Sequence, residues 1–368
     1  MIRFRLPAGY DRRAGVLGSI AEVVAPLGSR ALLIGGETAL HLVQPAIGAA
    51  LAGQGIALAS RVARGRPTAA LVSQAAAAIA VGGFDVVIAA GGGRALDLAK
   101  AAAAEAGRPI VTVPTVPATC AAWAALSILY DEAGAQVEIR HLPRAPVHVL
   151  ADTAILAAAP ARFLAAGIAD TVVKWWETAP NLRGPGDPLA LRLQAHLGRF
   201  TLDTIEAAFA RHADLTQLAG DPEAWGDVVD AVVMLAGLVG SPRTGAAWGG
   251  FAHPFYVAAT RAPETHAVLH GAIVGFGLLV QWGLEGRAEA EIAAQAGWLR
   301  RLGLPVTLAE LGLTGDPATE AGRLAGPAAE AAARSVFGGA SEAAILGAIL
   351  AVDAIGRGLA ARPAAPAR

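Results

Sequence analysis

The chain of 368 residues contains one cysteine, two lysines and almost no net charge. Because Cys120 stands alone, an internal disulfide is excluded, and this cysteine usage is typical of a reducing cytoplasm. The formal net charge of −1 argues against nucleic acid or an anionic membrane as a partner, since both recruit clustered lysine and arginine. Charged residues make up only 16% of the chain and hydrophobic residues 55%, so we expect a folded protein with a large core.

Long apolar runs are missing as well. A membrane-spanning helix needs about 20 consecutive apolar residues, and the most apolar segment, 267–284, is interrupted by His270, Gln281 and several glycines. The first residues lack the apolar region of a secretory signal. We therefore expect a cytoplasmic protein with no membrane partner. At this length we expect two domains or one large lobed unit.

Lys100 and Lys174 are the two lysines among 29 basic residues. Because arginine is the default cation of this chain, these positions either need the compact ammonium of lysine or keep it by chance. Asp97 lies three residues before Lys100, a spacing that also suits a simple ion pair on a helix.

The first 150 residues alternate short apolar runs with alanine-rich segments of helical period, which is typical of a parallel sheet with crossover helices. After Asp152 the strand signals stop and helical periods follow. We predict an α/β N-terminal nucleotide-binding domain with a parallel sheet over 1–151, followed by an all-α C-terminal domain over 152–368. The expected strands are 31–34, 56–60, 85–89, 110–113 and 147–150, with a hairpin of 126–130 and 136–140; the expected helices are 13–25, 38–52, 68–81, 94–106, 161–178, 187–210, 223–239, 267–284, 288–302 and 341–360.

Three glycines, Gly91, Gly92 and Gly93, separate the expected strand 85–89 from the expected helix 94–106. Glycine lets the backbone approach a ligand closely, and a helix N-terminus favours a diphosphate. The loop indicates a nucleotide cofactor. A plain tight turn is the alternative, because the G-x-G-x-x-G spacing of dinucleotide folds is missing.

Three of the eight histidines, His253, His266 and His270, lie in a segment with few charges, and Asp170 lies within another apolar helix. We expect His266 and His270, four residues apart, on one face of a helix. One carboxylate and two imidazoles can bind Zn²⁺ or Fe²⁺ with positions open for substrate. Buried, hydrogen-bonded histidines are the alternative.

These segments together resemble the iron-containing alcohol dehydrogenase superfamily, and within it the glycerol dehydrogenases. The resemblance implies a nucleotide-binding α/β domain, a helical domain and an active site in the cleft between them. It also implies a metal-dependent alcohol dehydrogenase or carbonyl reductase, in which a divalent ion lowers the pKa of the alcohol and hydride passes to nicotinamide. The matching stretches are 91–100, 113–119, 125–127, 151–153, 159–170, 252–253 and 266–271, in family order over about 30–285.

Site residues follow from the resemblance position by position. Zinc is favoured over iron, because the step from His253 to His270 is like that of glycerol dehydrogenases and Lys174 stands where iron-dependent members have a histidine. His266 either supports the metal ligands, relays a proton or only packs a helix. The implied cofactor residues are Gly36, Glu37, Gly91, Gly92, Gly93, Asp97, Lys100, Thr115, Thr119 and Ser127, and the implied metal ligands are Asp170, His253 and His270.

Two departures from glycerol dehydrogenases bear on the substrate. Cys120, with Trp123 nearby, stands where those enzymes have an aspartate that contacts substrate, and Tyr256, beside Phe255, stands where they have a second histidine. We therefore expect a pocket of Cys120, Trp123 and Phe255 for an alcohol, aldehyde or ketone that is more apolar than glycerol. Tyr256, His266 and Lys174 are the candidate catalytic residues.

Cofactor choice and activity class stay open in the sequence. Glu37 could bind the ribose hydroxyls of NAD, whereas Arg61, Arg64 or Arg66 could bind the 2′-phosphate of NADP or be solvated loop residues. A cyclase that resembles 3-dehydroquinate synthase, with transient use of NAD, and a nucleotide-binding relative without turnover are the alternatives. An enzyme for a phosphorylated alcohol would need a phosphate grip, for which Lys174 is the only hint. We expect a homo-oligomer.

Overall fold

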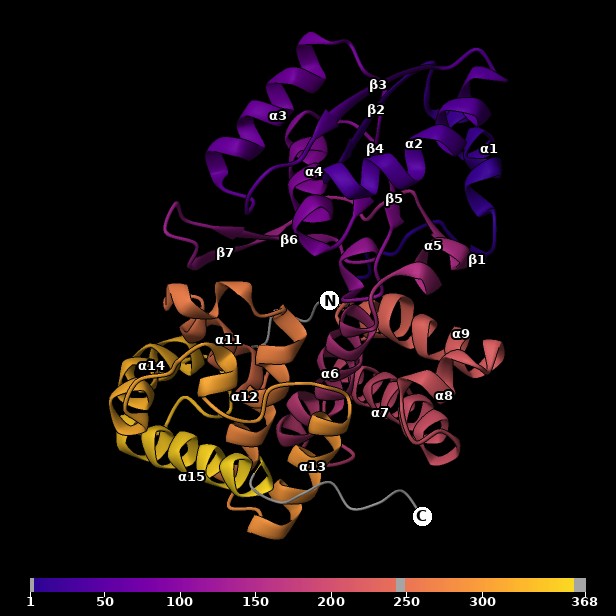
Figure 1. The fold of residues 1–368 in the computed structure, drawn as a ribbon. Coiled ribbons are helices and arrows are strands. Elements are labelled where there is room, and N and C mark those ends of the chain that lie inside the picture. The colour runs from indigo at the N-terminus through magenta and orange to yellow at the C-terminus, as the bar shows by residue number, and fades with distance from the viewer. Residues whose placement is uncertain (1–2, 243–248, 361–368) are drawn as a thin grey trace. The chain divides into compact units, whose positions relative to one another are not determined.

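The computed structural model describes residues 3–242 and 249–360 and is drawn in Figure 1. The chain divides into two compact units, Met1–Leu164 with Asp221–Thr244, and Ala165–Gly220 with Gly245–Arg368. The predicted division at residues 151 and 152 differs from this grouping chiefly in the segment 221–244. As a division into functional domains, 1–151 and 152–368 remain a proposal.

The first unit contains the predicted parallel sheet. Its six strands lie in the order β1-β8-β5-β4-β2-β3, and every neighbouring pair is parallel. The first strand was not predicted, because its residues GYDRR contain no apolar run, and it lies at the sheet edge beside β8. The strands are β1 (Gly9–Arg13), β2 (Arg30–Gly35), β3 (Ala57–Val62), β4 (Val86–Gly91), β5 (Ile110–Pro114) and β8 (His148–Asp152).

The central strands β4 and β5 are buried along their whole length, so helices must cover both faces of the sheet there. One core cluster joins Leu33, Ile88 and Val113 of the sheet to α1 (Ile20–Val24) and α2 (Glu37–Ala52). A second joins α3 (Ala69–Val81) and α4 (Gly93–Glu105) to the hairpin. The hairpin, β6 (Leu126–Tyr130) with β7 (Gln136–His141), confirms the prediction and extends from the sheet in Figure 1.

The expected helix over 13–25 is wrong as a continuous element. Gly15 takes a left-handed φ of 68° and Pro26 lacks an amide hydrogen, so the segment breaks into η1 (Val16–Ser19), α1 and η2 (Ala25–Leu27). A short helix, α5 (Thr153–Ala158), follows β8, with Asp152 as its N-cap. Another short turn, η3 (Cys120–Ala122), follows β5.

The segment 221–239 belongs to the first unit, and a partly buried polar contact ties it to β1. Asp230 Oδ1 accepts hydrogen bonds from Tyr10 Oη at 2.6 Å and Arg12 Nε at 2.7 Å. The segment is helical as predicted, with a π-helical turn inside it. Its parts are α9 (Pro222–Asp230), η5 (Ala231–Leu235) and α10 (Ala236–Val239).

The second unit is helical. Figure 1 shows α11, α12, α14 and α15 as the orange-to-yellow bundle. The expected helices over 161–178, 187–210, 288–302 and 341–360 are present, whereas α8, α11 and α14 were not predicted. The helices are α6 (Ala161–Thr178, which begins in the first unit), α7 (Leu189–Arg211), α8 (Leu215–Ala219), α11 (Ala252–Ala259), α12 (His270–Leu284), α13 (Glu289–Arg301), α14 (Pro317–Ala332) and α15 (Glu342–Ala360).

The expected helix over 267–284 begins later than predicted. His266 lies in a separate 3-10 turn, η6 (Pro263–Ala267), and α12 starts at His270 after an extended linker. The prediction that His266 and His270 share a helix face is therefore wrong, because two extended residues separate their helices. Within the described residues no helix has the length and apolar character needed to cross a membrane.

Candidate active site

The first candidate region is the point at which the strand order of the sheet reverses. The chain passes from β2 to β3 toward one edge, and from β4 through β5 and β8 toward the other. Open α/β sheets bind ligands outside the carboxyl ends of the strands at such a point. The two strands that meet at this point both end in glycine, β2 at Gly35 and β4 at Gly91. Gly35 pairs with Ala90, and a Cβ on Gly35 would lie 2.6 Å from the Ala90 carbonyl oxygen.

The predicted glycine loop lies at this point. Gly91 ends β4 with a left-handed φ of 144°, which a side chain would strain, and Gly92 is the N-cap of α4. A Cβ on Gly92 would lie 3.0 Å from Val116, so the loop passes close to the turn after β5. No side chain caps α4, and its first amide hydrogens are therefore available to an anion.

Two polar residues of the resemblance, Thr115 and Thr119, lie beside this loop, and Thr115 N donates a hydrogen bond to the Gly91 carbonyl oxygen at 3.2 Å. A Cβ on Gly93 would lie 3.5 Å from Thr119 Oγ1, which accepts a hydrogen bond from Ala121 N, and Thr115 is buried. Ser127 is fully buried, and among the described residues nothing hydrogen-bonds to its Oγ. A buried hydroxyl is normally paired, so Ser127 suits a polar ligand atom.

Lys100 has a different environment from the one that the resemblance suggested. Its side chain is fully buried, and Nζ contacts Asp97 Oδ1 at 3.1 Å and the carbonyl oxygens of Ala124 and Leu126 at 3.1 and 2.5 Å. These contacts favour the ion-pair alternative. Lys100 holds the start of β6 against α4, and its role toward the cofactor stays a prediction.

At the carboxyl end of β2, Gly36 is the N-cap of α2 and Glu37 is the first residue of that helix. Arg64 donates a hydrogen bond to Glu37 at 2.8 Å, and both side chains are exposed. Arg61 instead contacts Gln74, and Arg66 donates to the Gly134 carbonyl oxygen and lies over the Tyr130 ring. Of the three arginines considered for a 2′-phosphate, Arg64 is the one beside Glu37.

The second candidate region is a cluster of Asp170, His253 and His270 in the helical unit. One ligand atom from each residue lies within 4.8 Å of the other two. His253 Nε2 is 3.3 Å and His270 Nε2 3.7 Å from Asp170 Oδ1. Asp170 lies on α6, His253 on α11 and His270 on α12, so tertiary packing brings the cluster together.

Two glycines of α12 permit that packing. A Cβ on Gly271 would lie 1.9 Å from the Ala166 carbonyl oxygen of α6, and one on Gly277 would lie 2.7 Å from the Ala252 carbonyl oxygen of α11. Both distances are too short for any side chain. Glycine therefore lets α12 approach the helices that carry Asp170 and His253.

The charges of the cluster are strongly coupled. Burial would raise the pKa of Asp170, but the Lys174 ammonium and hydrogen bonds from the two histidines hold that pKa well below its usual range. Lys174 Nζ lies 2.8 Å from Asp170 Oδ1 and 3.3 Å from His253 Nε2. The carboxylate is thus ionised, as a metal ligand must be.

The two imidazoles differ. Burial lowers the pKa of His270, and Asp170 only partly opposes this effect. Burial, the largest effect, and the Lys174 ammonium would lower the pKa of His253, but the Glu177 carboxylate and the hydrogen bond to Asp170 together outweigh them and raise that pKa to about 8. A metal would therefore have to displace a proton from His253 near neutral pH.

Glu177 is the important residue that sequence reasoning missed. Its Oε2 lies 2.5 Å from His253 Nδ1, and its Oε1 accepts a hydrogen bond from His253 N at 2.9 Å. Burial would raise the pKa of Glu177, but His253 outweighs it, so that pKa is lowered. The spacing of seven residues from Asp170, two helical turns, could have indicated it. This contact directs His253 Nε2 toward Asp170.

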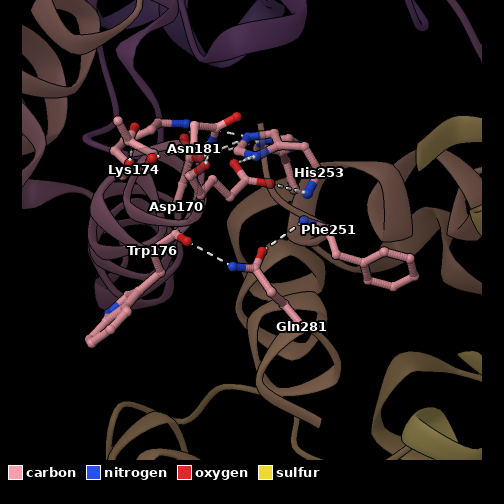
Figure 2. A network of polar contacts seen from close by, with 10 residues as sticks. Asp170, Lys174, Trp176, Asn181, Phe251, His253 and Gln281 are labelled. Atoms are coloured by element: carbon pink, nitrogen blue, oxygen red, sulfur yellow. Dashed lines mark hydrogen bonds and ion pairs between the residues drawn. The ribbon is translucent and has the colours of Figure 1, made fainter. Parts of the chain in front are cut away.

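The buried Gln281 side chain supports the pair of Glu177 and His253, as Figure 2 shows. Gln281 Oε1 accepts a hydrogen bond from Phe251 N at 2.7 Å, and its Nε2 donates to the Trp176 carbonyl oxygen at 2.7 Å. Trp176 precedes Glu177, and Phe251 is the N-cap of the helix that carries His253. Gln281 thus fixes the two segments that hold this carboxylate and imidazole.

Two of the predicted catalytic residues, Tyr256 and Lys174, lie beside the proposed metal ligands, and His266 does not. Tyr256 is buried, and its ring lies edge-to-face against His270 with centroids 4.2 Å apart. Lys174 contacts Asp170 and His253, as given above. His266 lies outside the cluster: its Nε2 is 2.9 Å from the Thr260 carbonyl oxygen, a contact that favours the packing alternative.

The residues predicted to line a substrate pocket are mostly buried. Phe255 is fully buried and its ring lies 5.4 Å from that of Phe276, so it packs in the core of the helical unit. Trp123 is 7% exposed, and its ring lies 5.9 Å from that of Tyr10. A pocket role for these two stays a prediction. Cys120 is half-buried and stays a prediction.

Comparisons with known proteins identify the family. The sequence model described as iron-containing alcohol dehydrogenase matches residues 7–153. A glycerol dehydrogenase of Pseudomonas putida is 32% identical over 95% of this chain and 97% of that protein. A glycolaldehyde reductase of Halobacterium salinarum is 32% identical over 84% of this chain and 85% of that protein.

A solved structure gives the same result for the fold. The crystal structure of a probable glycerol dehydrogenase from Sinorhizobium meliloti is similar with a TM-score of 0.81 and 31% identity. The similarity covers 97% of this chain and 99% of that one. The resemblance seen in the sequence and the predicted fold class are both confirmed.

Proposed function

The chain belongs to the iron-containing alcohol dehydrogenase superfamily, in the branch of the glycerol dehydrogenases, and we propose from this that Asp170, His253 and His270 bind its divalent metal. As a member it is an oxidoreductase that acts on CH–OH groups. The observation that carries the proposal is the convergence of three ligand atoms within 4.8 Å, with Glu177 behind His253.

The donor set fits a divalent ion. A buried ionised carboxylate and two imidazoles leave room for substrate in a zinc or iron coordination sphere. An ion bound there would act as a Lewis acid and polarise the alcohol or carbonyl oxygen. We propose zinc, because Lys174 rather than histidine follows Asp170 by four residues.

The chain's own residues then have separate tasks. Glu177 keeps the proton of His253 on Nδ1 and so leaves Nε2 for the ion. Tyr256 packs its ring on His270 and fixes that imidazole. We assign the proton that the reacting oxygen gains or loses to the Tyr256 hydroxyl; His266, which contacts a backbone carbonyl oxygen, is the alternative.

The nucleotide site is proposed at the ends of β2 and β4. The amide hydrogens at the start of α4 would hold the diphosphate, with Gly91, Gly92 and Gly93 allowing close approach. The Ser127 hydroxyl, which has no hydrogen-bond partner within the described part of the chain, would bind the remainder of the cofactor together with Thr115 and Thr119. A nicotinamide cofactor would supply the hydride acceptor in oxidation and the hydride donor in reduction.

NAD and NADP are both proposed as cofactors. Glu37 and Arg64 pair at the end of β2, so a carboxylate for ribose hydroxyls and a guanidinium for a 2′-phosphate stand side by side. A Glu37→Ala variant is expected to weaken NADH binding and to leave Arg64 available to NADPH. The ratio of KM for NADH to KM for NADPH measures this; an unchanged ratio would contradict it.

The substrate is proposed to be a small alcohol, aldehyde or ketone that has a more apolar part than glycerol where Cys120 replaces an acidic residue of the glycerol dehydrogenases. The single cysteine supports a cytoplasmic enzyme. We further propose a homo-oligomer, which light scattering tests.

The function is tested by chelating the protein, adding Zn²⁺ or Fe²⁺ separately, and following NADH and NADPH oxidation with aldehydes and ketones. His270→Ala is the matched variant, because it removes one ligand and leaves Asp170 and His253. It is expected to lose bound metal and turnover together. Full turnover without bound metal would refute the assignment.

A further inference from the structure

A buried lysine stands among the proposed metal ligands. Lys174 lies on α6, one turn after Asp170 and just before Glu177, and its side chain is 11% exposed. The chain has 27 arginines (29 basic residues less two lysines), so a lysine is an unusual choice of basic residue in this chain. The other lysine, Lys100, holds backbone carbonyl oxygens, whereas the ammonium of Lys174 contacts two proposed ligands.

The charge at the site has a consequence for the substrate. Asp170 and Glu177 carry two negative charges, which already balance a divalent ion between neutral imidazoles. The Lys174 ammonium adds one positive charge in a largely buried site. A divalent ion would also compete with this ammonium for the Asp170 carboxylate. An anion that accompanies the substrate would stabilise the ammonium in its place.

The position of the ammonium specifies where that anion sits. Nζ is 3.3 Å from His253 Nε2, the nitrogen left for the ion because Nδ1 faces Glu177. Nζ therefore lies beside two atoms proposed to hold the ion, Asp170 Oδ1 and His253 Nε2. In a 2-hydroxy or 2-oxo acid the carboxylate is attached directly to the reacting carbon, so both groups reach their partners at once.

Resting on the function proposed above, we propose that Lys174 binds a substrate carboxylate, and that the enzyme interconverts 2-hydroxy acids and 2-oxo acids. In reduction the carbonyl carbon gains a hydride from NAD(P)H and the oxygen gains a proton, which gives the 2-hydroxy acid and NAD(P)⁺. The carboxylate is unchanged.

The test compares 2-oxobutanoate with its methyl ester in the zinc-loaded full chain. The ester keeps the activated carbonyl and loses the charge. We expect the wild type to prefer the acid in kcat/KM by about tenfold or more, the ratio that one charge-assisted hydrogen bond supplies. Lys174→Met is expected to lower kcat/KM for the acid by about 10- to 100-fold, mainly through KM. Lys174→Arg, which keeps the charge, should retain more of the acid preference.

A binding measurement separates this inference from the proposed function. Isothermal titration of the zinc-loaded protein with 2-hydroxybutanoate should show binding that weakens by about tenfold in Lys174→Met. If no aldehyde or ketone of the panel described above is reduced, the proposed function fails, and the titration alone decides the role of Lys174. If the panel is reduced but neither 2-oxobutanoate nor its ester is, the inferred substrate class is wrong. A wild type that does not prefer the acid, or a variant that loses acid and ester equally, overturns the inference while the dehydrogenase assignment stands. Should Lys174→Met not fold, the wild-type comparison of acid and ester decides.

Discussion

Replacement of Glu177 by glutamine should weaken metal binding although no proposed metal ligand is touched. The carboxylate accepts two hydrogen bonds from one residue, at 2.5 Å from His253 Nδ1 and 2.9 Å from His253 N. A glutamine has a single acceptor oxygen. It can therefore satisfy one of these donors and must turn its amide nitrogen toward the other.

Both orientations of the glutamine are unfavourable. If its oxygen faces Nδ1, its NH₂ group opposes the backbone N–H of His253, and a buried donor is left unpaired. If its oxygen faces the backbone, its NH₂ donates to Nδ1 and moves the ring proton to Nε2, the atom that should bind the ion. Loss of one hydrogen bond to a charged group is worth about 1.5 to 3 kcal/mol, or about 10- to 100-fold in affinity.

The assay is Zn²⁺ titration against a competing chelator at a fixed pH above 8, where His253 of the wild type has lost the proton that competes with the ion. Glu289→Gln, on the exposed first turn of α13, is the matched control and should bind like the wild type. Thermal unfolding of the metal-free proteins shows whether Glu177→Gln is folded. A folded variant that binds zinc within about twofold of the wild type would refute the role assigned to Glu177.

Three further outcomes follow. Because His253 has a pKa raised to about 8 and must lose its proton to bind metal, zinc affinity should rise as the pH rises toward 8 and level off above it; a titration series showing no change from pH 6.5 to 8.5 would contradict this. Lys100→Met removes the ammonium from Asp97 and two carbonyl oxygens, so it should destabilise the chain by about 3 to 5 kcal/mol in urea unfolding, whereas a cost below about 1 kcal/mol would argue against its buried role. Tyr256→Phe keeps the ring against His270, so bound zinc should be unchanged while kcat falls by about 100-fold; an unchanged kcat would remove the hydroxyl from proton transfer.

Local patterns in the sequence were sufficient for most of the fold. Apolar runs gave five of the sheet strands, and helical periods gave α6 and α12, which carry Asp170 and His270. The strand β1 was missed because its residues are polar, and α11 was missed because it is short. The break before His270 was missed because apolar residues continue through the extended linker.

The candidate site was predictable where residue type alone limits the chemistry. Scarce histidines and an aspartate in an apolar helix indicated the metal cluster. Glu177 and Gln281 were not found, because an isolated glutamate or glutamine becomes informative only when packing brings it to His253 or Phe251. The burial of Phe255 was hidden for the same reason, since sequence proximity to Tyr256 does not give the direction of a side chain.

The most direct test of the metal assignment is a titration of the chelated wild-type protein with Zn²⁺ while nicotinamide oxidation is followed. Turnover should be absent without metal, rise in proportion to added zinc and stop rising at one ion per chain, with no such rise in Asp170→Asn. Full turnover in the metal-free protein, or an equal response in Asp170→Asn, would contradict a metal centre of Asp170, His253 and His270.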